Sequence, residues 1–202
     1  DIELEASYDY NPDKANQLLD EAGWVMNEST GIREKDGEPL NLLLTLEADH
    51  NAVSMPTAEV IKSQLAEVGI DVTIYGTEQM QWYADYLEGK FDLTLWHCQF
   101  AFASPHCWFT PMDSMVPQTP SLPGIEGSDE FLATIKDLTN MVDEQEVRDT
   151  YTYLFNFDVG TVLDIPLTYQ KDMIVYNTDK ISGYTFTGTP YFFDILSLKP
   201  AE

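Results

Sequence analysis

The chain has 202 residues, a length that suits one large domain or two small ones and that can bury a substantial core. Its 35 acidic residues against 10 basic ones give a net charge of −25, while 44% of all residues are hydrophobic. This composition is typical of a folded protein with an acidic surface, and it excludes a disordered acidic tail. Nucleic acid is excluded as a partner, because phosphate binding needs a Lys/Arg patch and the sequence has none. The apolar runs are far shorter than the ~20 residues of a membrane helix, so we expect no transmembrane segment in this chain.

The first residues carry neither an initiator Met nor a charged segment followed by an apolar run. We therefore see no secretion signal, and we expect that the chain is a fragment.

Residues 8–23 predict an amphipathic helix, with Asn11 as its N-cap and Pro12 as its first helical residue. The turn-rich stretch 27–38 predicts a hairpin or a tight loop. A strand over 40–46 follows it.

The next elements alternate between helix and strand. We expect a helix over 54–68, a strand over 70–75, a helix over 78–87 capped by Thr77, and a buried strand over 91–96. The order β-α-β-α-β with short connections predicts an α/β layer sandwich.

A long stretch over 98–127 is rich in Pro and is predicted to be irregular. Loops of that length inside a compact domain are uncommon and are usually functional. The elements expected after it are a helix capped by Ser128 and reaching about 141, a helix capped by Asp143 and reaching about 156, paired strands over 162–169 and 172–176, and an extended aromatic tail over 183–200.

The motifs of nucleotide-binding and hydrolytic enzymes are absent from the sequence, which has no phosphate-binding glycine loop and no nucleophile elbow. Its three histidines, His50, His97 and His106, stand at no spacing that is typical of a catalytic site. Pairs of acids are expected by chance in a chain of this charge. We therefore expect a binding protein and not an enzyme, with no catalytic residue and no resident cofactor.

One concentrated constellation occupies residues 96–109, directly after a predicted buried strand. Open α/β sheets bind ligands at the carboxyl ends of their strands, and this segment combines aromatic rings with nitrogen and sulfur donors suited to Zn, Ni or Cu. The alternative is a loop that packs its aromatic rings beneath itself. The predicted ligand-binding residues are Trp96, His97, Gln99, Phe100, Phe102, His106 and Trp108, with His97 and His106 as candidate metal ligands.

Two cysteines, Cys98 and Cys107, lie nine positions apart inside this constellation. The spacing fits a local disulfide, two metal-binding thiols or two inert buried thiols.

Motifs along nearly the whole chain match one known pattern. They are Tyr10-x-Pro12-x-Lys14-Ala15, Leu18-Leu19-Asp20-Glu21-Ala22-Gly23-Trp24, Ile32-Arg33-Glu34-Lys35-Asp36-Gly37, Leu65-x-x-Val68-Gly69-Ile70-Asp71-Val72, Gly89-Lys90-Phe91-Asp92 and Ile165-Pro166-Leu167-Thr168-Tyr169. Together they resemble the carboxy-terminal lobe of the family 5 extracellular solute-binding proteins, the dipeptide, oligopeptide and nickel receptors of ABC importers. The third motif and the placement of Pro105-His106 are most similar to the nickel-binding branch.

The resemblance implies an α/β, periplasmic-binding-protein-like lobe (type II, cluster C) with a mixed sheet flanked by helices. Residues 1–182 would form the carboxy-terminal lobe of a two-lobed receptor, and residues 183–202 a tail that returns toward the hinge and the missing lobe. The implied function is capture of nickel as a chelate complex for the membrane permease subunits of an ABC importer. The implied location is extracytoplasmic, either in the periplasm or lipid-anchored at the cell surface.

A di- or oligopeptide receptor of the same family is the alternative, and an unrelated enzyme or interaction domain is a remote one. Relatives in the nickel branch show a Trp and a Tyr ahead of an Asp-Pro-His, where this chain has Gln99, Ala103 and Ser104-Pro105-His106. Peptide termini need charge partners, and the chain has only two Arg residues, Arg33 and Arg148. The sequence therefore favours a metal chelate over a peptide.

Overall fold

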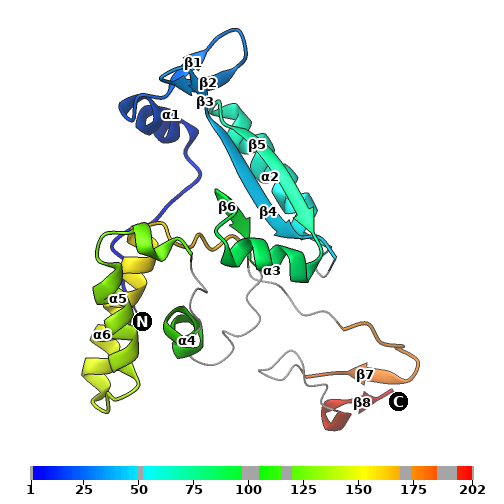
Figure 1. The fold of residues 1–202 in the computed structure, drawn as a ribbon. Helices are drawn as coiled ribbons and strands as arrows, with labels where there is room; N and C mark the ends of the chain where they lie inside the picture. The colour runs from blue at the N-terminus through cyan, green and yellow to red at the C-terminus, as the bar shows by residue number, and fades with distance from the viewer. Residues whose placement is uncertain are drawn as a thin grey trace.

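The computed structural model describes residues 2–49, 52–96, 105–114, 120–168, 174–185 and 195–201. The chain forms an antiparallel meander with one helix, a parallel sheet with two helices, a helical unit and a small carboxy-terminal hairpin (Figure 1). The hairpin stands apart from the other parts in this view. None of the described helices is both long and apolar enough to cross a bilayer.

Helix α1 (Pro12–Glu21) begins as predicted, because the side chain of Asn11 accepts a hydrogen bond from the backbone N–H of Lys14 at 2.9 Å. The predicted hairpin is confirmed as a meander with two tight turns. Its strands pair antiparallel in chain order and are β1 (Val25–Asn27), β2 (Ile32–Lys35) and β3 (Glu38–Pro39).

The predicted β-α-β-α-β order is confirmed, with the three strands parallel and arranged β5-β4-β6. The expected sheet was a mixed one. In the structure the central sheet is parallel throughout its described strands, and antiparallel pairs occur in the separate meander. The elements are β4 (Asn41–Glu47), α2 (Ser54–Glu67), β5 (Asp71–Thr77), α3 (Gln79–Leu87) and β6 (Leu93–Leu95).

The two helices cover opposite faces of this sheet. Successive side chains of a strand point to opposite faces, so Thr45 faces away from its neighbours in the strand. Its hydroxyl donates to Thr94 Oγ1 at 3.0 Å, where Trp82 of α3 also donates its indole N–H at 3.1 Å. The other face packs against α2 in an apolar cluster of Leu44, Leu46, Ala58 and Val72.

A second core lies in the helical unit, which contains α4 (His106–Ser114), α5 (Ser128–Leu138) and α6 (Glu144–Gly160). The ring of Phe109 meets those of Phe131 and Phe155 edge to face, with centroids 6.0 and 4.9 Å away. The cluster comprises Phe109, Leu122, Phe131, Ile135, Leu138 and Leu154, with Leu122 supplied by the short helix η1 (Leu122–Gly124). This unit is therefore held by its own aromatic core.

The structure corrects the prediction for the helical unit in two places. Helix α4 lies within the stretch predicted to be irregular, because Phe109 is fully buried against α5 and α6 and such packing outweighs weak local propensity. The N-cap of α5 is Gly127 in a left-handed conformation, and the predicted cap Ser128 is its first residue. The predicted cap of α6 is confirmed, because Asp143 accepts hydrogen bonds from two backbone N–H groups of the first turn.

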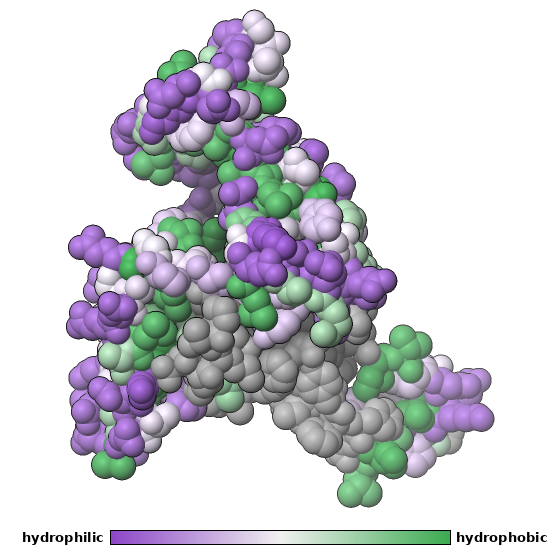
Figure 2. Space-filling view, viewed as in Figure 1, coloured by the Kyte–Doolittle hydropathy of each residue, from purple (hydrophilic) through white to green (hydrophobic). Residues whose placement is uncertain are grey.

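The paired strands predicted near the carboxyl terminus are wrong for the described residues, since 162–168 and 174–176 lie outside every strand. A strand needs a neighbouring edge for its backbone groups, and no described segment supplies one here. Several apolar side chains of this region are exposed, among them Ile165, Leu167 and Val175. Figure 2 shows further hydrophobic residues at the surface around the carboxy-terminal hairpin. Further along, β7 (Ile181–Gly183) pairs with β8 (Lys199–Pro200), and the short helix η2 (Ile195–Ser197) precedes β8.

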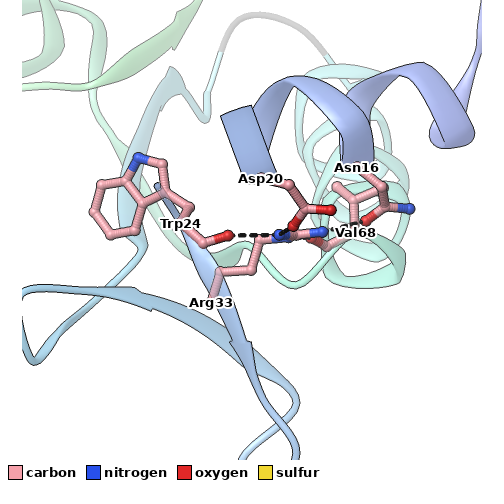
Figure 3. Close-up of polar contacts among 5 residues, drawn as sticks. All are labelled: Asn16, Asp20, Trp24, Arg33 and Val68. Atoms are coloured by element: carbon pink, nitrogen blue, oxygen red, sulfur yellow. Dashed lines mark hydrogen bonds and ion pairs between the residues drawn. The ribbon is translucent and has the colours of Figure 1, made fainter. Parts of the chain in front are cut away.

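Arg33 is buried and joins α1, the meander and the end of α2 (Figure 3). Its Nη1 donates to Asp20 Oδ1 and to the carbonyl oxygen of Trp24, both at 2.6 Å. Its Nη2 donates to Asn16 Oδ1 at 2.7 Å, and its Nε donates to the carbonyl oxygen of Val68 at 2.8 Å. One guanidinium therefore fixes the positions of these three elements relative to one another.

Gly69 allows the close approach that this arrangement requires. The backbone N–H of Arg33 donates to the carbonyl oxygen of Gly69 at 2.7 Å. Gly69 has φ +82°, and a Cβ at this position would lie 2.6 Å from Met26 Cε and 2.9 Å from Arg33 Cγ. Any larger residue would therefore strain the backbone and force the side chains of Met26 and Arg33 to shift.

We expect Arg33→Ala to lower the free energy of unfolding by about 3 kcal/mol, because the buried side chain is lost and its four acceptors, one buried and three half-buried, lose their donor. Arg33→Lys should recover less than half of that loss, because an ammonium group cannot reproduce the planar fork. Urea denaturation measures both effects. The control is Arg148→Ala at an exposed position of α6, which should change stability by less than about 0.5 kcal/mol. Equal losses for both alanine variants would contradict the prediction.

Candidate functional site

The carboxyl ends of β4, β5 and β6 lie at one edge of the central sheet, because the three strands are parallel (Figure 1). Parallel α/β sheets bind ligands at this edge. A shallow cavity of about 510 Å³, wide open to solvent, lies between the ends of β4 and β5. It is lined by Ala48, Asp49, Gly76, Thr77, Glu78 and Gln81.

The polar groups of this cavity are hydroxyl, amide and carboxylate groups. Asp49 Oδ1 accepts a hydrogen bond from the backbone N–H of Gln79 at 3.2 Å and so caps the first turn of α3. This corrects the prediction that Thr77 caps α3, since Glu78 holds the N-cap position and makes no capping bond with its side chain. Thr77 Oγ1 is buried and finds no hydrogen-bond partner in the described ranges.

Trp96 follows β6 directly and rests on an aromatic stack supplied by α3. Its ring centroid lies 5.1 Å from that of Trp82 and 5.0 Å from that of Tyr86. Tyr86 in turn stacks on Phe91, with centroids 5.5 Å apart. Trp82 and Tyr86 are buried, whereas Trp96 is 43% exposed. Trp96 therefore presents one part of its ring to solvent from a fixed aromatic base.

Hydrogen bonds fix the base of this stack. The hydroxyl oxygen of Thr94 accepts from the indole N–H of Trp82 and from the hydroxyl of Thr45. The Thr94 hydroxyl itself donates to the carbonyl oxygen of Thr45 at 3.4 Å. Because its donor and both of its acceptor positions are used, the orientation of the Trp82 ring is determined by the sheet.

The other predicted ligand-binding residues fall in two groups. His106 is the first residue of α4 and is half-buried. Trp108 packs against the aromatic core of the helical unit and donates its indole N–H to Asp158 Oδ2 at 3.2 Å. His97, Gln99, Phe100 and Phe102 lie outside the described residues, so the ligand site over 96–109 stays a prediction.

The predicted metal ligands His97 and His106 also stay a prediction. No cluster of three or more His, Cys, Asp or Glu side chains suited to a metal occurs in the part of the chain that the structure describes.

One pair of titratable groups was not singled out by the sequence. Asp158 of α6 is only 5% exposed, and burial, together with the charge of Asp164, raises its pKa to about 7. Burial also raises the pKa of Asp164. No sequence signal marks this pair, because two acids six positions apart are common in a chain with 35 of them.

Comparison with known proteins identifies the family. Residues 2–119 match the profile of the "Bacterial extracellular solute-binding proteins, family 5 Middle", which covers more than half of the chain. The chain belongs to this family. The resemblance seen in the sequence is thereby confirmed.

Individual family 5 proteins show the same relationship. The nickel-binding periplasmic protein of Escherichia coli is 27% identical over 169 residues, which are 82% of this chain and 32% of that protein. The oligopeptide-binding protein OppA of Lactococcus lactis subsp. cremoris is 43% identical over 70 residues, or 34% of this chain and 11% of that protein. The chain therefore spans about a third of the nickel-binding relative and a smaller share of the oligopeptide-binding one.

Solved structures confirm the α/β fold of the periplasmic binding proteins. NikA from Brucella suis, in complex with Fe(III)-EDTA, superposes with a TM-score of 0.85 at 28% identity over 96% of this chain and 39% of that one. AppA from Bacillus subtilis, in complex with a nonapeptide, superposes with a TM-score of 0.67 at 20% identity over 100% of this chain and 40% of that one. At the latter identity the likeness concerns the fold alone.

We expect Thr94→Val to loosen the aromatic stack, because the indole N–H of Trp82 loses its acceptor in a buried position. The near-ultraviolet circular dichroism of the stack should weaken, and the free energy of unfolding should fall by about 1–2 kcal/mol. Thr94→Ser keeps the hydroxyl and should restore the spectrum. Identical spectra for the Val and Ser variants would refute the role of the hydroxyl.

The pairing of Cys98 with Cys107 stays a prediction as well. Cys107 is an exposed free thiol on α4, and Cys98 lies outside the described residues. In an oxidising compartment we expect the two thiols to form a disulfide across this short loop. Intact-mass measurement after alkylation without reduction checks it: a bridged chain gains no alkyl group, whereas two added groups would show that the thiols stay free.

Proposed function

We propose that this chain is part of the solute-binding component of an ABC importer and that it captures nickel as a chelate complex. It would deliver the complex to membrane permease subunits from an extracytoplasmic location, in the periplasm or anchored by lipid at the cell surface. The observation that carries the proposal is the extent of the likeness. The nickel-binding relative matches 82% of the chain, whereas two oligopeptide-binding relatives match 34% and 38% of it.

The chemistry of the sheet edge supports a cationic solute. The cavity is lined by the acids Asp49 and Glu78, and no basic side chain lines it among the described residues. The net charge of −25 attracts cations from a distance. The exposed ring of Trp96 offers a face that favours cationic and ring-bearing groups, as in nickel coordinated by histidine.

The extended carboxy-terminal segments support the proposal that residues 1–182 form one lobe of a larger receptor. Residues 162–168 expose Ile165 and Leu167 without a sheet partner in the described chain. Such side chains are typical of a surface that another part of a protein covers. Residues 183–202 would then form the tail that returns toward the second lobe.

The second candidate is a di- or oligopeptide receptor. It is favoured by the higher local identity of the oligopeptide-binding relatives, which reaches 43% over 70 residues.

Calorimetry on the full chain distinguishes the two candidates, with nickel(II) plus histidine, nickel(II) alone and a pentapeptide as probes. We expect nickel plus histidine to bind with Kd of ~0.1–1 mM, equivalent to roughly 4–5.5 kcal/mol, because a second lobe that closes over the solute would supply the remaining contacts. Trp96→Ala should abolish the signal, whereas Tyr153→Ala on the distant α6 should leave it unchanged.

Two results would contradict the proposal. Tighter binding of the pentapeptide than of the nickel complex would favour the second candidate. A sub-micromolar site for nickel alone that is lost in His97→Ala would show that the loop binds the metal without a chelator.

A further inference from the structure

The last turn of α6 folds back on itself and brings two acidic residues together. The backbone N–H of Leu163 donates to the carbonyl oxygen of Asp158, and that of Val162 donates to the carbonyl oxygen of Val159, both at 3.1 Å. These two bonds close the helix in a Schellman motif. The next residue, Asp164, thereby returns to the side of Asp158.

The turn adopts a backbone conformation that its sequence disfavours. Val162 has φ +57°, in the left-handed region where Gly or Asn is usual and a β-branched residue is strained. Contacts outside the turn must therefore hold it. Leu163 supplies one of them, because its side chain packs against the aromatic core of the helical unit.

The carboxyl pair supplies a second contact. Asp158 Oδ2 accepts the indole N–H of Trp108, while Asp158 Oδ1 is buried and has no donor among the described residues. The carboxyl group of Asp164 lies within hydrogen-bonding reach of that of Asp158. Two ionised carboxylates are both acceptors, so a hydrogen bond between them requires a proton on one of the two.

No other described charge compensates the pair. Burial, the charge of Asp164 and the contact between the two carboxyl groups raise the pKa of Asp158, whereas Trp108 and the backbone of Asp164 lower it; no other group contributes. The remaining ionisable side chains that the structure describes on the elements packed around it are Glu3 and Glu5 on the amino-terminal segment, His106 and Cys107 on α4, Asp129, Glu130, Lys136 and Asp137 on α5, and Glu144, Glu146, Arg148, Asp149, Tyr151 and Tyr153 on α6. None of these groups shifts the pKa of Asp158, so a proton is the simplest counter-charge for the pair.

We propose that Asp158 and Asp164 share one proton and act as a pH-sensitive latch, which fastens the segment leaving α6 to the helical unit when protonated and releases it when the proton is lost. This inference goes beyond solute capture and does not depend on it. Asp164 is the mobile partner, because Asp158 stays bonded to Trp108 in either state. The released segment would be residues 164–168, which carry exposed apolar side chains.

The direction of the pH effect follows from proton binding. Burial raises the pKa of Asp158 to about 7, so the folded chain holds the proton where the unfolded chain has lost it. The contribution of the latch to stability is complete below the ordinary aspartate pKa of about 4. It declines as the pH rises and is lost once the pH passes about 7.

Carbon-13 NMR of the aspartate carboxyl groups in the full chain tests the proposal directly. We expect the signals of Asp158 and Asp164 to titrate together, with an apparent midpoint near 7. The exchange protection of the Leu163 amide should fall over the same pH range, beyond the intrinsic acceleration by base. Midpoints near the ordinary value of about 4 for both groups would overturn the proposal.

A substitution that mimics the protonated state sharpens the test. In Asp158→Asn the amide can donate to Asp164 while its carbonyl accepts from Trp108, so protection of the Leu163 amide should become independent of pH apart from the intrinsic rate. Asp164→Asn places the donor on the other partner and should behave in the same way. Asp137→Asn on α5 is the control and should keep the wild-type pH dependence.

Two outcomes of this experiment would overturn the latch. One is an unchanged pH dependence in both the Asp158→Asn and Asp164→Asn variants. The other is saturable protection by Ca²⁺ or Mg²⁺ at high pH in the wild type, which would show that a metal ion and not a proton is the natural counter-charge of the pair.

Discussion

The position of the meander depends on the guanidinium of Arg33. Its side chain is bonded to α1, to the turn before β1 and to the end of α2, and its backbone carbonyl accepts the N–H of Leu40 at 2.7 Å just before β4 begins. Burying a cation is costly unless its donors are satisfied, and here carbonyl, amide and carboxylate oxygens satisfy them. The planar fork of Arg fits these acceptors in fixed directions, so the same contact that neutralises the charge also sets the entry into the central sheet.

The two faces of the central sheet differ in polarity. One face is apolar and packs against α2, which stabilises the sheet through burial. The other face presents Thr45 and Thr94 to α3, and their hydroxyls orient Trp82 beneath Trp96. The sheet therefore does more than support its carboxyl edge, because it also fixes the aromatic ring that stands there.

The helical unit has its own hydrophobic core and contains the carboxyl pair of Asp158 and Asp164. Its aromatic cluster is separate from the apolar cluster of the sheet. The amino-terminal segment runs from the helical unit to α1 (Figure 1). The backbone N–H of Glu5 donates to Asn156 Oδ1 at 2.7 Å, and Asn156 Nδ2 donates to the carbonyl oxygen of Glu3 at 3.3 Å. The Asp158 pair lies inside this unit, so its protonation acts on α6 and the segment after it without passing through the sheet.

The sequence by itself determined the elements whose signals are local. Asn11 and Asp143 cap their helices through their own side chains, the alternation of strands and helices predicts the parallel sheet, and family membership follows from short motifs. Only the tertiary structure decided the rest. Helix α4 exists because Phe109 is buried against distant helices, the cap of α3 comes from Asp49 after another strand, and the carboxyl pair forms because a strained turn at Val162 reverses the chain. Each of these features depends on packing between residues that are distant in the sequence. Local sequence patterns contain no information about such contacts.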